Sequence, residues 1–321
     1  MFSGKTTFLE FYDSSSAYGA AATFFVTLMV SVFVVDEVTD EYSQVDRLWS
    51  LLPPLTTLHY VIHTYRQTGI HSHRLTIALT LHAFWSVRLT WNFVRKGGYS
   101  GVEDYRWRVL KEWIPNKVLW RLFDLIFIAV IQLVLLLNIT APNAVFAEYA
   151  TVPMRLWEYG FVAAIVGWIM LESAADEYMW AYQQAKNFYK LLRKAPRGFT
   201  PQQLDRGFCT IGVFAYSRHA NFLAEQMIWV TLYLWGWALV VAEQGFVWAH
   251  WTIIGAIGYV LLFQGSTTFT EMITAGKYPE YAAYQAVVGR FLPWRVWTEP
   301  AGTEGPGDGP TAGPGETAKD K

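Results

Sequence analysis

Long apolar stretches recur along the chain and constrain its fold more than any other feature. Because a helix needs about 20 mostly apolar residues to cross a bilayer, windows of that length predict seven membrane-spanning helices. They cover residues 17–35, 48–63, 75–94, 118–140, 156–173, 222–243 and 246–264. The second window contains Pro53 and Pro54, so it is a candidate for a kinked or re-entrant segment. The sequence therefore predicts an all-α, multispan transmembrane bundle.

The composition supports a membrane protein and excludes several functions. Hydrophobic residues make up 53 % of the chain and charged residues 16 %, which is too apolar for an ordinary soluble domain. A net charge of −1 gives no globally basic face for phosphates, so we expect no nucleic-acid partner. The chain has one cysteine, Cys209, and can form neither an internal disulfide nor a CxxC metal site.

The distribution of Lys and Arg predicts the topology, because these residues concentrate in loops that stay cytosolic. With seven spans, the side that carries the C-terminus holds 19 of the 25 basic residues, and the opposite side holds 4. The N-terminus is therefore predicted to be lumenal and the C-terminus cytosolic. We expect a lumenal segment over 1–16, a transmembrane domain over 17–298 and a disordered, Gly- and Pro-rich tail over 299–321.

Histidine spacing gives no support for a metal site. His59 and His63 lie at i and i+4 on one helical face, but the seven histidines of the chain are too few and too scattered for the histidine boxes of a membrane di-iron enzyme. We expect His59 and His63 to line a polar interior or an interfacial rim as neutral hydrogen-bonding groups.

Carboxylates near the predicted cytosolic ends of the spans are candidates for a binding site. Glu172 and Asp176 are one helical turn apart in "LESAADEYMWAYQ", so they belong either to a solvated helix end or to a site for a ribose, an amide or an arginine. In "AYSRHANFLAEQ", the residues Arg218, Asn221 and Glu225 are spaced i, i+3 and i+7. This spacing predicts one shared helical face.

A carboxylate at position 225 falls inside a predicted span, where it needs a partner. A structural ion pair would supply one, and so would a cofactor pocket, because arginine suits a phosphate and asparagine suits an amide or a hydroxyl. A second group of cations surrounds Gly97 and Gly98 in "RLTWNFVRKGGYSGVEDYRWRVL". These cations either bind phosphate groups or only reflect the excess of Lys and Arg in cytosolic loops.

Together these stretches resemble the steroid 5-alpha-reductase superfamily, within a branch of membrane proteins that carry a steroid-reductase-like C-terminal domain. The resemblance covers residues 45–295, and its motifs are "RLTWN", "KGGYSGVEDYRW", "ESAADEYMWAYQ", "AYSRHANFLAEQ" and "KYPEYAAYQAVVGRFLPW". More distantly, the chain is similar to isoprenylcysteine carboxyl methyltransferases. The resemblance implies a steroid-reductase-like bundle in an internal membrane, the endoplasmic reticulum in a eukaryote, with a cofactor pocket open to the cytosol.

The resemblance also implies which residues bind NADPH. The cofactor-binding set is Arg88, Glu172, Asp176, Arg218, His219, Asn221, Glu225 and Glu271. Within it, Asn221 and Glu225 look like the residues that hold the nicotinamide end, and Asp176 looks like one that binds the adenosine or ribose. The acid that would polarise a substrate stays open among Glu225, Tyr105 and His82.

Several positions depart from the family pattern. Ala220 replaces a proline, and Trp85 replaces a tyrosine that could donate a hydroxyl proton to a substrate. Phe263, Thr267 and Glu271 replace an arginine, a histidine and a tyrosine of the last span and its end. A glutamate at the last of these positions is more like the methyltransferase side of the superfamily, so S-adenosylmethionine is the alternative cofactor.

Three functions follow from these features. The first is an NADPH-dependent oxidoreductase that reduces a C=C bond of a lipid or sterol-like molecule entering from the bilayer. The second is a lipid or isoprenylcysteine-type methyltransferase that uses S-adenosylmethionine. The third is a non-catalytic lipid-binding membrane protein. We favour the first.

Overall fold

The computed structural model describes residues 8–100 and 104–299, and all regular elements within these ranges are helices. The all-α prediction is therefore confirmed for the described part of the chain. The chain forms two compact units. The first comprises Met1–Ser173 and Asn221–Thr268, and the second comprises Ala174–Ala220 and Phe269–Lys321.

Five helical segments of the described chain are long and apolar enough to cross a membrane, which is compatible with an integral membrane protein. They are Ala17–Thr39, Lys117–Glu148, Glu158–Leu192, Ala220–Gln244 and Ile253–Lys277. The predicted spans 48–63 and 75–94 fall on α4 (Leu52–Thr68) and α5 (His73–Arg95), which are not among these five. The predicted count of seven spans is therefore not confirmed.

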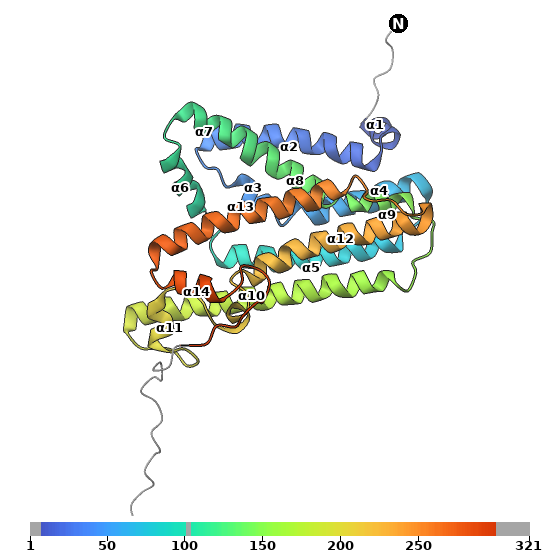
Figure 1. Ribbon diagram of the computed structural model, residues 1–321. Helices are drawn as coiled ribbons and strands as arrows, with labels where there is room; N and C mark the ends of the chain where they lie inside the picture. Colours follow the sequence, from blue (N-terminus) through green and yellow to red (C-terminus); the bar gives the residue numbers. More distant parts are fainter. Residues whose placement is uncertain (1–7, 101–103, 300–321) are drawn as a thin grey trace, which may run out of the picture. The chain divides into compact units, whose positions relative to one another are not determined.

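The long helices of the first unit run side by side as a bundle (Figure 1). Helix α4 packs against α5, α2 (Ala17–Thr39), α8 (Gln132–Ile139) and α9 (Pro142–Glu148), and α2 also packs against α8 and the π-helix η1 (Asp124–Ile131). Buried aromatic and aliphatic side chains such as Phe25, Leu133 and Trp235 fill the interior. Helix α13 (Ile253–Lys277) approaches α8 so closely that a Cβ atom at Gly255 would overlap the backbone of Asn138.

Local sequence explains where several of these helices begin. Pro53 and Pro54 lie in the first turn of α4, where proline is tolerated because its missing N–H has no intrahelical partner. The proline pair, which made this window a candidate for a kinked or re-entrant segment, therefore lies at the start of a helix. Small helices precede and link the long ones: α1 (Phe8–Ser14), α3 (Gln44–Leu48), α6 (Tyr105–Trp113) and α7 (Lys117–Phe123).

Two acidic residues are fully buried where α2 packs against η1. Asp36 lies on α2 and Asp124 is the first residue of η1, and both side chains have no accessible surface. The two carboxyl groups interact electrostatically, and neither carries a hydrogen bond to another group in the described residues. This pair was not predicted from the sequence.

Helix α10 (Glu158–Leu192) extends well beyond the predicted span 156–173. Residues 174–192 contain no glycine or proline and are rich in Ala, Gln, Lys and Leu, which favour helix. Glu172 and Asp176 consequently lie within a continuous helix, not at the end of one as expected.

The second unit is built from the C-terminal part of α10, α11 (Pro201–Arg206), the 3-10 helix η2 (Gly212–Ala215), the end of α13 and α14 (Tyr281–Val287). Its interior includes Tyr182, Leu204 and Phe214. The segment after α14 is held by Arg206, whose guanidinium donates to the carboxylate of Glu299 at 2.6 Å and 3.0 Å.

Candidate functional site

A buried carboxylate, that of Glu225 on α12 (Ala220–Gln244), is the centre of a polar cluster in the first unit. Its Oε2 atom accepts a hydrogen bond from Nε1 of Trp85 at 2.8 Å. Its Oε1 atom accepts from Nε1 of Trp229 at 2.9 Å and from the hydroxyl of Tyr259 at 2.6 Å. Glu225 thus has the partners that an acid inside a predicted span requires.

One arginine serves two carboxylates in this cluster. The Nη2 atom of Arg88 lies 2.9 Å from Oε1 of Glu172 and 3.4 Å from Oε2 of Glu225. Neutral indole and phenol donors also surround Glu225, and the carboxyl groups of Glu172 and Glu225 form a hydrogen bond with each other. We call these residues the Glu225 cluster: Trp85, Arg88, Glu172, Glu225, Trp229 and Tyr259. Because Trp85 gives its only polar hydrogen to Glu225, it holds that carboxylate in place and is not a proton donor for a substrate.

His82 borders the Glu225 cluster, since its ring lies 5.0 Å from the Trp229 ring. Its Nδ1 atom lies 2.7 Å from Oγ1 of Thr57, which also accepts a hydrogen bond from Nδ2 of Asn143 at 3.1 Å. The Nε2 atom of His82 has no hydrogen-bond partner within the described residues. His82 therefore has one ring nitrogen committed to the protein and one that is not.

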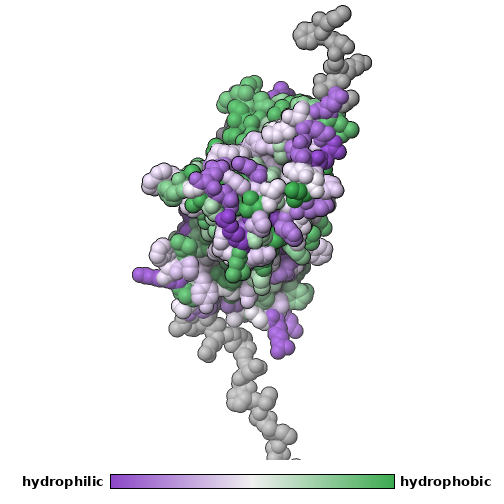
Figure 2. All heavy atoms as spheres, turned by 90° about the vertical axis from the view of Figure 1, so that its right-hand side faces the viewer, coloured by the Kyte–Doolittle hydropathy of each residue, from purple (hydrophilic) through white to green (hydrophobic). Residues whose placement is uncertain are grey.

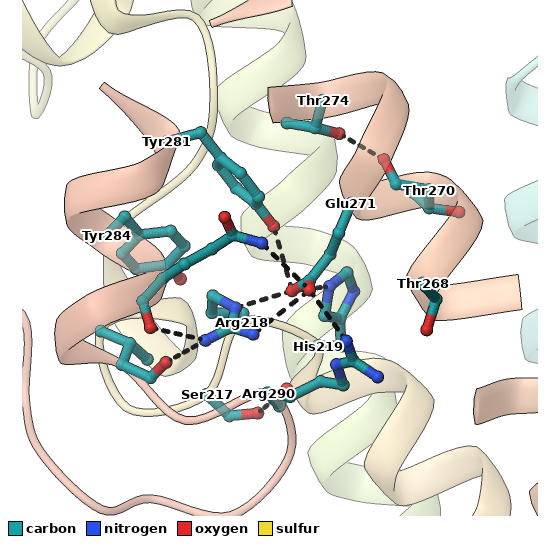
Figure 3. Close-up of polar contacts among 12 residues, drawn as sticks. Ser217, Arg218, His219, Thr268, Thr270, Glu271, Thr274, Tyr281, Tyr284 and Arg290 are labelled. Carbon is teal, nitrogen blue, oxygen red and sulfur yellow. Dashed lines mark hydrogen bonds and ion pairs between the residues drawn. The ribbon is translucent and has the colours of Figure 1, made fainter. Parts of the chain in front are cut away.

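The second unit contains another polar cluster, centred on Glu271 of α13 (Figure 3). The Nε atom of Arg218 lies 2.6 Å from Oε1 of Glu271, and Nε2 of His219 lies 3.0 Å from the same oxygen. The other oxygen, Oε2, lies 3.4 Å from Nη2 of Arg290 and accepts a hydrogen bond from Nε2 of Gln285 at 3.2 Å. With Tyr281, which donates to Oε1 at 3.4 Å, these residues form the Glu271 cluster.

Backbone hydrogen bonds fix the segment that carries the first two cations. The N–H groups of Arg218 and His219 donate to the carbonyl oxygens of Gly289 and Arg290 at 3.0 Å and 3.1 Å. Helix α12 begins only at Ala220, so these two residues lie outside it. The prediction that Arg218 shares a helical face with Asn221 and Glu225 is therefore wrong.

Positive charge exceeds negative charge in the Glu271 cluster. One carboxylate faces two guanidinium groups and one imidazole. Burial and the negative charge of Glu271 raise the pKa of the Tyr281 phenol, which therefore stays protonated as a donor. The side chain of Arg290 is 35 % exposed, compared with 9 % for Arg218. The cluster can thus present a cation to an anionic ligand.

The predicted site residues divide between the two units. Arg88, Glu172, Asn221 and Glu225 belong to the first unit, and Asp176, Arg218, His219 and Glu271 belong to the second. The structure joins three of the first group and three of the second in the two clusters described above.

Three further predicted residues lie on α12, α10 and α6. Asn221 is half-buried in the first turn of α12, and Asp176 is buried on α10. Tyr105 is the first residue of α6, but its side chain lies outside the described part of the structure. Two contacts were not predicted from the sequence: that of Arg290, which follows Glu271 by 19 residues, and that of Tyr259 as a donor to Glu225. No local spacing in the sequence marks either contact.

His59 and His63 are hydrogen-bonding groups, in agreement with the sequence analysis. Nε2 of His59 lies 2.8 Å from the carbonyl oxygen of Ala17, and Nε2 of His63 lies 3.0 Å from that of Ser15. No group of three or more metal-ligating side chains is found among the described residues.

These features define the class of protein: within residues 8–100 and 104–299, it is all-helical, with membrane-length helices and two polar clusters, each organised by a buried glutamate. The chain belongs to the family described as "Protein of unknown function (DUF1295)", which matches residues 32–288. It is similar to "Uncharacterized protein C594.04c" of Schizosaccharomyces pombe, with 36 % identity over 305 residues, 91 % of this chain and 84 % of that protein. No solved structure matches the chain.

Proposed function

We propose that this protein is a membrane-embedded, NADPH-dependent reductase that acts on a C=C bond of a lipid or sterol-like substrate. The observation that carries the proposal is the surplus of positive charge in the Glu271 cluster. The surrounding residues 174–220 and 269–299 reinforce it, because they contain ten Lys and Arg against six Asp and Glu. This balance agrees with the cytosolic side predicted for these segments, where NADPH is accessible.

The donor groups of the cluster fit a phosphate. Guanidinium groups bind phosphate oxygens through paired, charge-assisted hydrogen bonds, and His219 adds a third nitrogen donor when protonated. NADPH carries three phosphate groups, whereas S-adenosylmethionine carries none and has a positive sulfonium centre. The cluster therefore favours NADPH of the two cofactors. When bound, NADPH supplies the hydride for reduction of a C=C bond.

We assign different roles to the residues of the cluster. Arg290 is the more exposed arginine and would meet a phosphate first. Arg218 is held by Glu271 and by the carbonyl oxygens of Gln285 and Val288, so it would supply a fixed positive charge. The family resemblance supports the same cofactor.

Binding of NADPH to the detergent-purified, full-length protein tests the proposal. We expect isothermal titration calorimetry to show that Arg290→Gln weakens binding by about tenfold to a hundredfold, because a hydrogen bond to a charged group is worth about 1.5–3 kcal/mol. Arg295→Gln is the matched control, since Arg295 is exposed and lies outside the cluster. It should leave the dissociation constant unchanged. The thermal midpoint of each variant, measured in the same detergent, shows whether it is folded.

Binding of NADPH and of S-adenosylmethionine distinguishes the three candidate functions. Equal NADPH affinity in the wild type and a folded Arg290→Gln variant would overturn the assignment of the Glu271 cluster. Binding of S-adenosylmethionine without NADPH would replace the reductase by a methyltransferase. Binding of neither cofactor would favour a non-catalytic lipid-binding protein.

A further inference from the structure

A pocket of about 470 Å³ opens in the first unit, where the start of α2, the end of α4, α9 and Trp251 meet. This end of the unit carries many hydrophilic side chains (Figure 2). The side chains that line the pocket include those of Tyr18, His63, Thr64, Gln67, Glu148 and Trp251. Trp251 follows the C-terminal end of α12, whereas Glu225 lies near its start. At 1.5 Å per residue, the helix separates them by about 30 Å.

The polar lining of the pocket is rich in hydrogen-bond acceptors. His63 uses Nε2 as a donor to the carbonyl oxygen of Ser15, and in this Nε2–H tautomer Nδ1 is an acceptor. Gln67 uses Nε2 as a donor to the carbonyl oxygen of Asp13 at 2.6 Å, which leaves its Oε1 as an acceptor. Glu148 adds an exposed carboxylate, which interacts electrostatically with His250.

Thr64 and the aromatic side chains complete the lining. Thr64 is buried to 4 % exposure, and its Oγ1 atom has no hydrogen-bond partner within the part of the chain described. An unpaired hydroxyl in such a place costs free energy that a ligand would recover. Trp251 packs edge-to-face against Tyr18 with 4.9 Å between ring centroids, and it is 43 % exposed. An exposed indole face attracts a cation.

We propose that this pocket binds a primary ammonium group attached to an apolar body. Three N–H donors match the acceptors of His63, Gln67 and Thr64. The positive charge matches the carboxylate of Glu148 and the indole of Trp251. The ammonium group could belong to the head group of an ethanolamine lipid or to a free amphiphilic amine. This site is separate from the Glu271 cluster and does not depend on the proposed reductase activity.

The chemistry of the ligand is tested with 2-phenylethylamine as the probe and the full-length protein in detergent. We expect saturable binding by isothermal titration calorimetry, with 2-phenylethanol at least tenfold weaker because it lacks the charge. The N,N,N-trimethyl derivative, which keeps the charge and lacks N–H donors, should also bind more weakly. Equal binding of the amine and the alcohol would overturn the proposal, and this comparison needs no variant.

Variants locate the site. Glu148→Gln should weaken amine binding by about tenfold, because one charge-assisted contact is lost, and Thr64→Val should weaken it less. Glu112→Gln makes the same change at an exposed glutamate outside the pocket and should have no effect. If Glu148→Gln and Thr64→Val are folded and bind the amine as the wild type does, the pocket is not the site.

Native mass spectrometry distinguishes the two sources of the ammonium group. The protein is released from nanodiscs that contain equal amounts of ethanolamine and choline glycerophospholipids. Preferential retention of the ethanolamine lipid, lost in Glu148→Gln, identifies a lipid head group as the ligand. Binding of 2-phenylethylamine without such retention identifies a free amine. Retention of the choline lipid at the same level, together with undiminished binding of the trimethyl probe, would contradict a requirement for N–H donors.

Discussion

Replacing Glu225 with glutamine keeps the size of the side chain and removes its charge from the interior of the first unit. Glu225 accepts hydrogen bonds from Trp85, Trp229 and Tyr259, and it lies 3.4 Å from Arg88. A glutamine has one carbonyl oxygen for these donors, and its NH₂ group would face at least one of them. The variant therefore leaves buried donors without an acceptor.

The expected loss of stability in Glu225→Gln follows from the burial of the Glu225 side chain. Glu225 is 5 % exposed, and breaking a buried charge pair by changing one partner typically costs about 3–5 kcal/mol. For a chain of this size, 1 kcal/mol corresponds to about 2–4 °C in the thermal midpoint. We expect Glu225→Gln to lower the midpoint by about 6–20 °C.

Thermal unfolding in detergent, followed by tryptophan fluorescence, measures this shift. Asp13→Asn is the matched control, because Asp13 pairs with Arg66 and the two side chains are 40 % and 41 % exposed. Such a surface pair contributes about 0–1 kcal/mol, so the midpoint of the control should change little. If both variants unfold within about 2 °C of the wild type, the Glu225 cluster does not stabilise the fold as the contacts indicate.

Two further perturbations probe the described contacts. Asp36→Asn should raise the thermal midpoint by several degrees, because its amide can donate to Asp124 and one of the two buried carboxyl groups is removed. A lower midpoint would contradict the interpretation of Asp36 and Asp124 as two buried acids that destabilise each other. Burial alone would raise the pKa of Glu299, but its hydrogen bond to Arg206 and the charge of Arg206 hold that pKa below its usual range. The ion pair therefore stabilises the fold above the unfolded pKa of about 4.3. This contribution is lost as the pH falls through the lower, folded pKa. The difference in midpoint between the wild type and Glu299→Gln, equivalent to about 1 kcal/mol at pH 7, should therefore disappear at acidic pH, and a difference that persists there would contradict this assignment.

The apolar windows predicted the helical class because hydrophobic length is a local property of the sequence. Element ends were harder to place. The proline pair after Leu52 made its window a candidate for a kinked or re-entrant segment, but it lies in the first turn of α4. The apolar window that ends at residue 173 gave no sign that α10 continues to Leu192, because the continuation is polar and depends on helix propensity.

The polar residues of the site were selected because a charged group inside a predicted span carries a free-energy cost, but their interaction partners were not predicted. Glu225 and Arg88 were selected from the sequence, and the structure joins them. The spacing of Arg218 suggested a shared face with Glu225, yet backbone pairing with residues 289 and 290 holds Arg218 outside α12. Arg290 reaches Glu271 only through the packing of the second unit. Contacts between residues far apart in the sequence have no period from which to predict them.

The carboxylate of Glu271 has a consequence for any anion that approaches its cluster. The carboxylate is already paired with Arg218, His219 and Arg290. It therefore competes with the ligand for the same hydrogen-bond donors. A phosphate can bind strongly only at donors that the carboxylate leaves uncovered, or by displacing it from one of them. The same residue that keeps two arginines in place without a ligand thus sets an upper limit on how tightly an anion is held.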